Sequence, residues 1–382
     1  MTGSLQLKNN RYYVVLNIYD EFGKRHRKWI KTELTTKSKV KEREQKLREI
    51  LSQYESNPQI LKSKVLFSDY VKVWLKEAKI KVDKVTYQHY ENDAKNHIIP
   101  YFDNIGIKLV DVDRQVLQNY FIKKYENGRK DGKGGLSPKT LKHHKNIIYQ
   151  TLELALLNGM ITSNPCNAIS LPKIEKNTYK FYNADEARLF LDTVKNEELY
   201  PLYLVTLYFG LRRSEVLGLK WDSIDFEAKR LTIKHTRTRC NEIIEKDKTK
   251  TKSSLRSFPL SDDMINLFVR LKNAERANQK LFGKDYIKND YIFKWQNGSP
   301  YDPDYITHKF KKTLKKYGLK QITFHGLRHT CGSLLNEQGH TLKDAQEWLG
   351  HADIQTTANI YLHLDTKQKE NISNSLTGVL IN

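Results

Sequence analysis

Two segments without helical or strand periodicity divide this chain of 382 residues into three blocks, which requires a fold of several domains. The first segment begins at Ser56-Asn57-Pro58-Gln59, where a proline and turn-forming residues interrupt a helical pattern. The second, residues 171–182, contains Pro172 and several lysines, which is typical of an extended linker. A chain of this length can bury a separate core in each block. We therefore expect domains at 1–64, 65–170 and 183–382, with 171–182 as the linker.

The first block predicts a small sheet followed by a helix. Short runs of β-forming residues alternate with turn residues such as Asn9-Asn10, and a thin apolar stripe at helical spacing follows them. Residues 1–64 contain fifteen Lys and Arg but only seven Asp and Glu. Such a sheet can carry basic and aromatic side chains into a DNA groove, and a purely structural β+α cap is the alternative. The expected strands are residues 5–7, 12–19 and 27–32, and the expected helix is 38–54.

The second block is helical, and the third mixes helices with short strands. Ser137-Pro138 is a helix start, with Ser as N-cap and Pro at the first helical position. The basic, glycine-rich loop 127–135 either follows a phosphate backbone or is simply solvated. The whole pattern predicts a mainly α fold with small β-sheets (α+β). The expected helices of the second block lie at 67–75, 87–99, 113–125 and 137–157, and the expected strands of the third at 230–235 and 257–260.

Charge and cysteine usage limit the partner and the compartment. The formal net charge is +22, and it is spread along the whole chain, which favours nucleic acid over an acidic membrane surface. Cys166, Cys240 and Cys331 are odd in number and far apart, so they fit neither a disulfide framework nor a CxxC metal motif. There is no apolar signal segment and no run of membrane-spanning length. We expect a soluble protein of the bacterial cytoplasm.

The third block contains residue types that bind a phosphodiester and transfer protons during its cleavage. Guanidinium groups donate paired hydrogen bonds to phosphate oxygens, and Arg212 and Arg328 are the candidates. Glu215, three residues after Arg212, is placed to orient it. On a helix, His325, Arg328 and His329 share one face, which favours a phosphate site. The alternative is a metal site made from these histidines and His351, but an arginine in the cluster would repel a cation.

Nucleophile and general-acid candidates lie near these groups in the sequence. Tyr361 follows Leu349-Gly350-His351, and nearby guanidinium groups would favour its phenolate. A lysine on a loop between strands can protonate a leaving oxygen, and Lys250 and Lys252 both qualify. Residue type alone does not select Tyr361, because the chain has 22 tyrosines.

The motifs of the third block resemble those of the tyrosine recombinase (phage-type integrase) family in their order, their spacing and their C-terminal position. The second block resembles the family's helical, SAM-like core-site-binding domain, and the first resembles the arm-site-binding module of integrases from conjugative transposons and temperate phages. The third resembles the mixed α/β catalytic domain. The matching motifs are Gly-Leu-Arg at 210–212 with Ser214-Glu215, Lys-Thr-Lys-Ser-Ser at 250–254, Phe258-Pro259-Leu260, His-Gly-Leu-Arg-His at 325–329, Leu-Gly-His at 349–351 and Tyr361.

The resemblance implies a role for each matched residue, within a site-specific recombinase that integrates and excises a mobile genetic element. Arg212 and Arg328 would clamp the phosphate, and His325 and His351 would stabilise the phosphorane or move protons. Tyr361 would form a 3′-phosphotyrosyl link. Lys250 would be the general acid, with Lys252 as the alternative candidate for that role. His329 and His363 would lie behind the residues that touch the phosphate and support them. Neither a metal nor a nucleotide would be needed.

The resemblance also implies partners. Four protomers would assemble on two duplexes of double-stranded DNA, the element ends and the target site, and resolve a four-way junction. The tail, residues 367–382, would dock on a neighbouring protomer or pack within its own. An excision accessory protein and a host DNA-bending protein are further possible partners.

Two other functions compete with this reading. A type IB topoisomerase would use similar chemistry without site recognition. A non-catalytic DNA-binding regulator would need none of Arg212, Arg328 and Tyr361.

Overall fold

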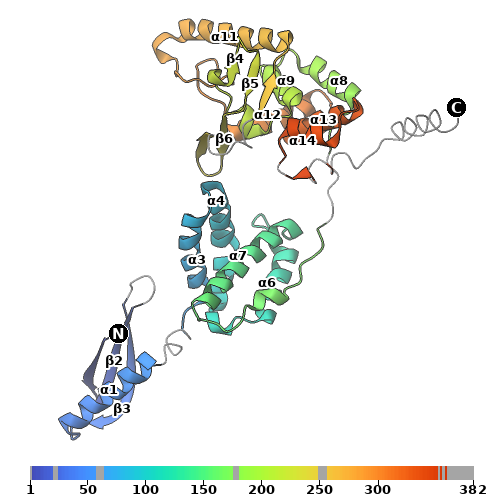
Figure 1. The fold of residues 1–382 in the computed structure, drawn as a ribbon. Helices are drawn as coiled ribbons and strands as arrows, with labels where there is room; N and C mark the ends of the chain where they lie inside the picture. The colour runs from blue at the N-terminus through green and yellow to red at the C-terminus, as the bar shows by residue number, and fades with distance from the viewer. Residues whose placement is uncertain are drawn as a thin grey trace, which may run out of the picture. The chain divides into compact units, whose positions relative to one another are not determined.

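The computed structural model separates the chain into two compact units, residues 1–176 and 177–382 (Figure 1). The structure describes residues 2–19, 25–56, 64–174, 180–247, 256–351, 353, 354 and 358.

The first unit begins with a three-stranded antiparallel sheet in the order β1-β2-β3. Asn9 and Asn10 both have positive φ, 50° and 61°, as in the two-residue hairpin turns that match strand twist. Val14 and Leu16, two residues apart on β2, lie on one face and form a small core with Ile50 of α1. The predicted strand and helix order of this block is confirmed. The elements are β1 (Thr2–Lys8), β2 (Arg11–Tyr19), β3 (Arg25–Thr35) and α1 (Val40–Ser56).

The rest of the first unit is a helical bundle with its own core. Ser137 accepts a hydrogen bond from the backbone N–H of Thr140, and Pro138 begins α7, as predicted. The expected helix 87–99 is instead interrupted by a π-helical turn, Ala94–Ile98, ahead of Pro100, which cannot donate a backbone hydrogen bond. The helices are α3 (Phe67–Lys81), α4 (Lys84–Asp93), α5 (Ile99–Ile105), α6 (Arg114–Asn127) and α7 (Pro138–Leu157).

In the described part of the second unit, helices and two small sheets pack around one large core. Asn183 and Glu186 form a capping box at the start of α8. Tyr182, in the expected linker, is buried here, and its N–H donates to Thr330 Oγ1 at 3.0 Å. The helices are α8 (Ala184–Val194), α9 (Tyr200–Phe209), α10 (Arg213–Val216), α11 (Asp262–Phe282), α12 (Pro303–Lys316), α13 (Phe324–Glu337) and α14 (Leu342–Leu349).

The strands of the second unit differ from the sequence prediction. The expected strand 230–235 is split: its first part pairs with β8, and its end begins a separate hairpin, β6–β7. That hairpin was missed because its residues are mostly polar and solvent-accessible, so it lacks apolar alternation. The strands are β4 (Ile224–Asp225), β5 (Arg230–Thr232), β6 (His235–Arg239), β7 (Ile243–Asp247) and β8 (Ser257–Pro259).

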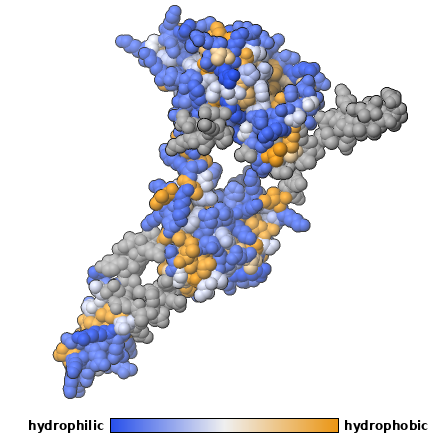
Figure 2. Space-filling model, in the orientation of Figure 1, coloured by the Kyte–Doolittle hydropathy of each residue, from blue (hydrophilic) through white to orange (hydrophobic). Residues whose placement is uncertain are grey.

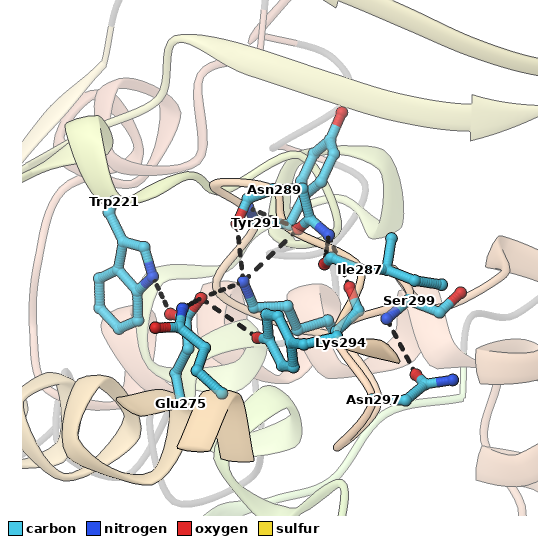
Figure 3. Close-up of polar contacts among 11 residues, drawn as sticks. Trp221, Glu275, Ile287, Asn289, Tyr291, Lys294, Asn297 and Ser299 are labelled. Carbon is cyan, nitrogen blue, oxygen red and sulfur yellow. Dashed lines mark hydrogen bonds and ion pairs between the residues drawn. The ribbon is translucent and has the colours of Figure 1, made fainter. Parts of the chain in front are cut away.

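A buried ion pair attaches α11 to the loop that follows it (Figure 3). Lys294 and Glu275 are in contact, with side chains 5% and 10% exposed. The Trp221 indole N–H also donates to Glu275, and Lys294 donates to the backbone oxygen of Asn289 at 2.9 Å. The loop is therefore held against α11 by the ion pair and by the hydrogen bonds that Trp221 and Asn289 make with its two members.

The surface agrees with the modest apolar content of the chain, in which 38% of the residues are hydrophobic. Figure 2 shows hydrophilic residues over most of the visible described surface. Among the described residues, no helix has the length and apolar character needed to cross a bilayer.

Candidate active site

The site begins at the turn between α9 and α10. Gly210 ends α9 with φ +61°, and a Cβ there would lie 2.4 Å from Leu349 Cδ2, so the close approach requires glycine. Arg212, two residues after Gly210, is the N-cap residue of α10. The turn thus directs Arg212 away from the apolar core that holds Leu211.

Glu215 orients Arg212, as its position three residues later predicts. Its carboxylate accepts hydrogen bonds from the Arg212 backbone N–H and from Arg212 Nη1, both at 2.9 Å. Arg212 Nη2 donates to the backbone oxygen of Gly350 at 3.1 Å. Because Glu215 is only 1% exposed, this carboxylate acts as a fixed support within the protein.

The same carboxylate gathers two more guanidinium groups. Arg256 Nη2 donates to Glu215 Oε2 at 2.5 Å, and Arg328 Nη1 lies 4.0 Å from that oxygen. Three cations therefore surround one buried anion. The cluster has a positive excess that suits an anionic ligand.

Arg328 has the geometry of an anion-binding group. It is fully buried on α13, and its Nη1 donates to the backbone oxygen of Gly210 at 2.7 Å. Its Nε and Nη2 have no hydrogen-bond partner within the described part of the chain. Burial and the charge of Arg212 lower the pKa of Arg328 to about 9, which leaves it protonated at pH 7. Two buried donors are thus oriented for a ligand's oxygens.

The histidines near these arginines are neutral at pH 7. Burial, Arg328 and Arg212 lower the pKa of His351 to about 3, and burial and His325 lower the pKa of His329 to about 4. His325 is exposed, yet the surrounding protein reduces its solvation and, with Arg328, also lowers its pKa. The His325 and His329 rings lie 4.8 Å apart on α13. A neutral imidazole can accept a proton from a phenol or donate a hydrogen bond to a phosphate oxygen.

The structure brings together four of the predicted site residues: Arg212, His325, Arg328 and His351. The predicted nucleophile Tyr361 and the two general-acid candidates, Lys250 and Lys252, lie outside the described residues, as does His363.

Sequence reasoning missed Arg256. In a chain with 66 Lys and Arg, nothing in its type or spacing separates it from surface arginines. Arg213, beside Arg212, contacts α12 instead, where its Nη1 donates to Thr307 Oγ1 at 2.6 Å.

A second candidate surface lies on the N-terminal sheet, opposite α1. The strand register puts Tyr13 across from Lys31 and Val15 across from Trp29 on this face. Trp29 is 45% exposed, and Lys8 Nζ lies 5.9 Å from the centre of its ring. The face therefore combines cations with an accessible aromatic ring, as nucleic-acid-binding sheets do.

Comparisons with known proteins cover nearly the whole chain. Residues 180–368 match the phage integrase family, and residues 66–125 match the phage integrase N-terminal SAM-like domain. A tyrosine recombinase XerC-like protein of Caldanaerobacter subterraneus subsp. tengcongensis is 30% identical over 398 residues, covering 98% of this chain and 98% of the relative.

Two solved structures have a similar fold. The Tn1549 transposon integrase in complex with a circular intermediate DNA has a TM-score of 0.66 at 20% identity, covering 82% of this chain and 99% of that one. A lambda integrase tetramer bound to a Holliday junction has a TM-score of 0.56 at 18% identity, covering 91% and 95%. The expected fold class, α+β with a helical SAM-like domain, is confirmed.

Proposed function

The chain belongs to the phage integrase family of tyrosine recombinases, and from this we propose that the Glu215-centred cluster binds the phosphodiester that is cut. The protein is a site-specific recombinase of a mobile genetic element, and it cuts and rejoins DNA.

The proposed reaction is a transesterification by the Tyr361 phenol. Its oxygen attacks phosphorus, a 3′-phosphotyrosyl bond forms, and the bond from phosphorus to the 5′-oxygen breaks. The phenol proton passes to a neutral imidazole, His351 or His325, and Lys250 gives a proton to the leaving 5′-oxygen. Rejoining reverses these steps with a new 5′-hydroxyl. Because the phosphotyrosine keeps the bond energy, the reaction needs no nucleotide, and we propose that it needs no metal ion.

The observation that carries this proposal is the pair of Arg328 donors, Nε and Nη2, buried without a hydrogen-bond partner in the described residues. A buried guanidinium with two such donors is costly unless a ligand accepts from them. The phosphorane develops negative charge on its non-bridging oxygens and would accept from Arg328 and Arg212 together.

A nicked suicide substrate, which traps the covalent intermediate, tests the nucleophile. The full chain should form a protein–DNA adduct, and Tyr361→Phe should bind the same DNA without forming one. An adduct that persists in Tyr361→Phe would refute the assignment. Relaxation of plasmids without a cognate site would favour a topoisomerase instead.

Arg328→Lys tests the phosphate clamp. An ammonium group cannot donate two parallel hydrogen bonds, so we expect adduct formation to slow by about 10²-fold or more, with DNA binding changed much less. Arg188→Lys is the matched control, because Arg188 is exposed on α8 and pairs with Asp185, three residues earlier. Equal losses of binding and cleavage in Arg328→Lys would mean that Arg328 only binds.

We propose that DNA recognition is divided along the chain. The helical block, residues 65–170, would bind core sites, and residues 1–64 would bind arm sites through the sheet face that bears Trp29. Trp29→Ala should weaken arm-site binding by several-fold and leave core-site binding unchanged, with Trp295→Ala as a control in the other unit. Equal binding to arm-site DNA by Trp29→Ala and the wild type would contradict this division.

The proposed assembly is a homotetramer on two duplexes, in the bacterial cytoplasm, with residues 367–382 docking on a neighbour. The lambda integrase tetramer on a Holliday junction supports this stoichiometry by its similar fold. Deletion of 367–382 should leave monomer binding intact and reduce the tetrameric complex in analytical ultracentrifugation. An excision accessory protein and a host DNA-bending protein would act on the same complex.

A further inference from the structure

Arg256 connects two described parts of the proposed active site. It directly follows residues 248–255, which include both general-acid candidates, and its side chain is only 10% exposed. Its contacts reach Glu215 on α10 and the end of α14.

One set of contacts caps α14. Arg256 Nη1 donates to the backbone oxygen of Trp348 at 3.0 Å and also contacts that of Leu349. Carbonyls at a helix C-terminus lack intrahelical donors and carry partial negative charge, so a guanidinium satisfies both needs. Gly350 follows with φ +64°, and a Cβ there would lie 2.3 Å from Arg256 Cδ. The close contact therefore fixes the chain immediately before His351.

The other contact of Arg256 is with the carboxylate of Glu215. Arg256 Nη2 is 2.5 Å from Glu215 Oε2, whereas Arg328 Nη1 is 4.0 Å from the same oxygen. If Arg256 were absent, that oxygen would attract the Arg328 guanidinium, which has donors without protein partners in the described chain. Arg256 thus competes for the carboxylate and leaves Arg328 directed to a ligand.

We propose that Arg256 is a positioning residue for strand cleavage: it holds His351 in place through the end of α14 and keeps Arg328 available to the phosphate. The inference rests on the proposed function of this site. The planar guanidinium group of Arg256 contacts a carboxylate and two carbonyls at once, which a lysine cannot do. Displacement of His351 and Arg328 by about 1 Å is enough to slow a reaction by up to 10²-fold without loss of substrate binding.

The test compares Arg256→Lys and Arg256→Gln with Arg270→Lys, which changes an exposed arginine on α11. The full chain is assayed for DNA binding by mobility shift and for single-turnover adduct formation on the nicked substrate at saturating protein. Both Arg256 variants should bind within about threefold of the wild type and form adduct at least tenfold more slowly. Arg270→Lys should match the wild type in both assays.

A substrate with sulfur in place of the bridging 5′-oxygen separates positioning of the clamp from positioning of the general acid. A thiolate leaves without a proton, so this substrate should restore cleavage by Lys250→Ala but not by the Arg256 variants. Full restoration in Arg256→Lys, cleavage at the wild-type rate, or a parallel loss of binding and cleavage would each overturn the proposal. Failure of the proposed function is distinct, because the wild type would then form no adduct, or Tyr361→Phe would still form one.

Discussion

Removal of the Glu215 charge should destabilise the second unit strongly. Glu215→Gln keeps the side-chain volume but removes the carboxylate charge that contacts Arg212 and Arg256 and lies 4.0 Å from Arg328. Its new NH2 group would face guanidinium donors, so at least one hydrogen bond would be lost together with the charge. Because Glu215 is only 1% exposed, solvent cannot compensate for the lost charge and the lost hydrogen bond.

The expected magnitude follows from this burial. Loss of one partner from a buried ion pair costs about 3–5 kcal/mol, and here the free energy of unfolding should fall by that amount. For a unit of about 200 residues, each kcal/mol corresponds to roughly 2–4 °C, so the midpoint should drop by about 6–20 °C. Scanning calorimetry and urea unfolding of the full chain measure both quantities.

The matched control is Glu227→Gln, which makes the same charge change at an exposed position. It should alter the free energy of unfolding by no more than about 0.5 kcal/mol. If Glu215→Gln were equally mild, the arginine cluster would not depend on its buried carboxylate, and the reasoning about Arg256 and Arg328 would fail with it.

Three further changes test separate features. Gly350→Ala should lose about 1–3 kcal/mol more stability than Gly339→Ala, because both have positive φ but a Cβ meets no atom within 4 Å at Gly339; equal losses in urea unfolding would contradict the close contact. The pKa of His351, about 3, lies below its unfolded value, so the unfolded state binds more protons below about pH 6.5 and stability falls on acidification. His351→Asn should therefore remove about 2 kcal/mol of the stability loss between pH 7 and pH 5, and an unchanged pH dependence would refute the shift. Lys294→Met should cost about 3 kcal/mol by leaving the Glu275 carboxylate buried without its cation, whereas Lys294→Met with Glu275→Leu should recover part of it; no recovery in thermal melts would argue against the ion pair.

Local patterns in the sequence predicted much of the fold. The spacing of His325, Arg328 and His329 was enough to place them on one helical face, because helical periodicity depends only on neighbouring residues. Ser137-Pro138 marked a helix start for the same reason, since capping is a local hydrogen bond. The β6–β7 hairpin was missed because its stabilising contacts are not apolar and leave no alternation.

The active-site cluster, in contrast, could not be predicted from local sequence patterns. Arg256 is 41 residues from Glu215 and 93 residues from Leu349 in the sequence, and no periodicity relates these positions. Their meeting depends on how α9, α13 and α14 pack, on close approaches at Gly210 and Gly350, and on the direction of each guanidinium.

The sequence alone thus determined the family resemblance, the α+β class and the residue types suited to a phosphodiester, because these depend on composition, motif order and local geometry. Only the tertiary structure decided that one buried carboxylate serves three arginines and that Arg328 keeps two donors directed to no described protein atom. The physical reason is that desolvation and charge balance arise when distant segments pack together, and they are not properties of any one segment.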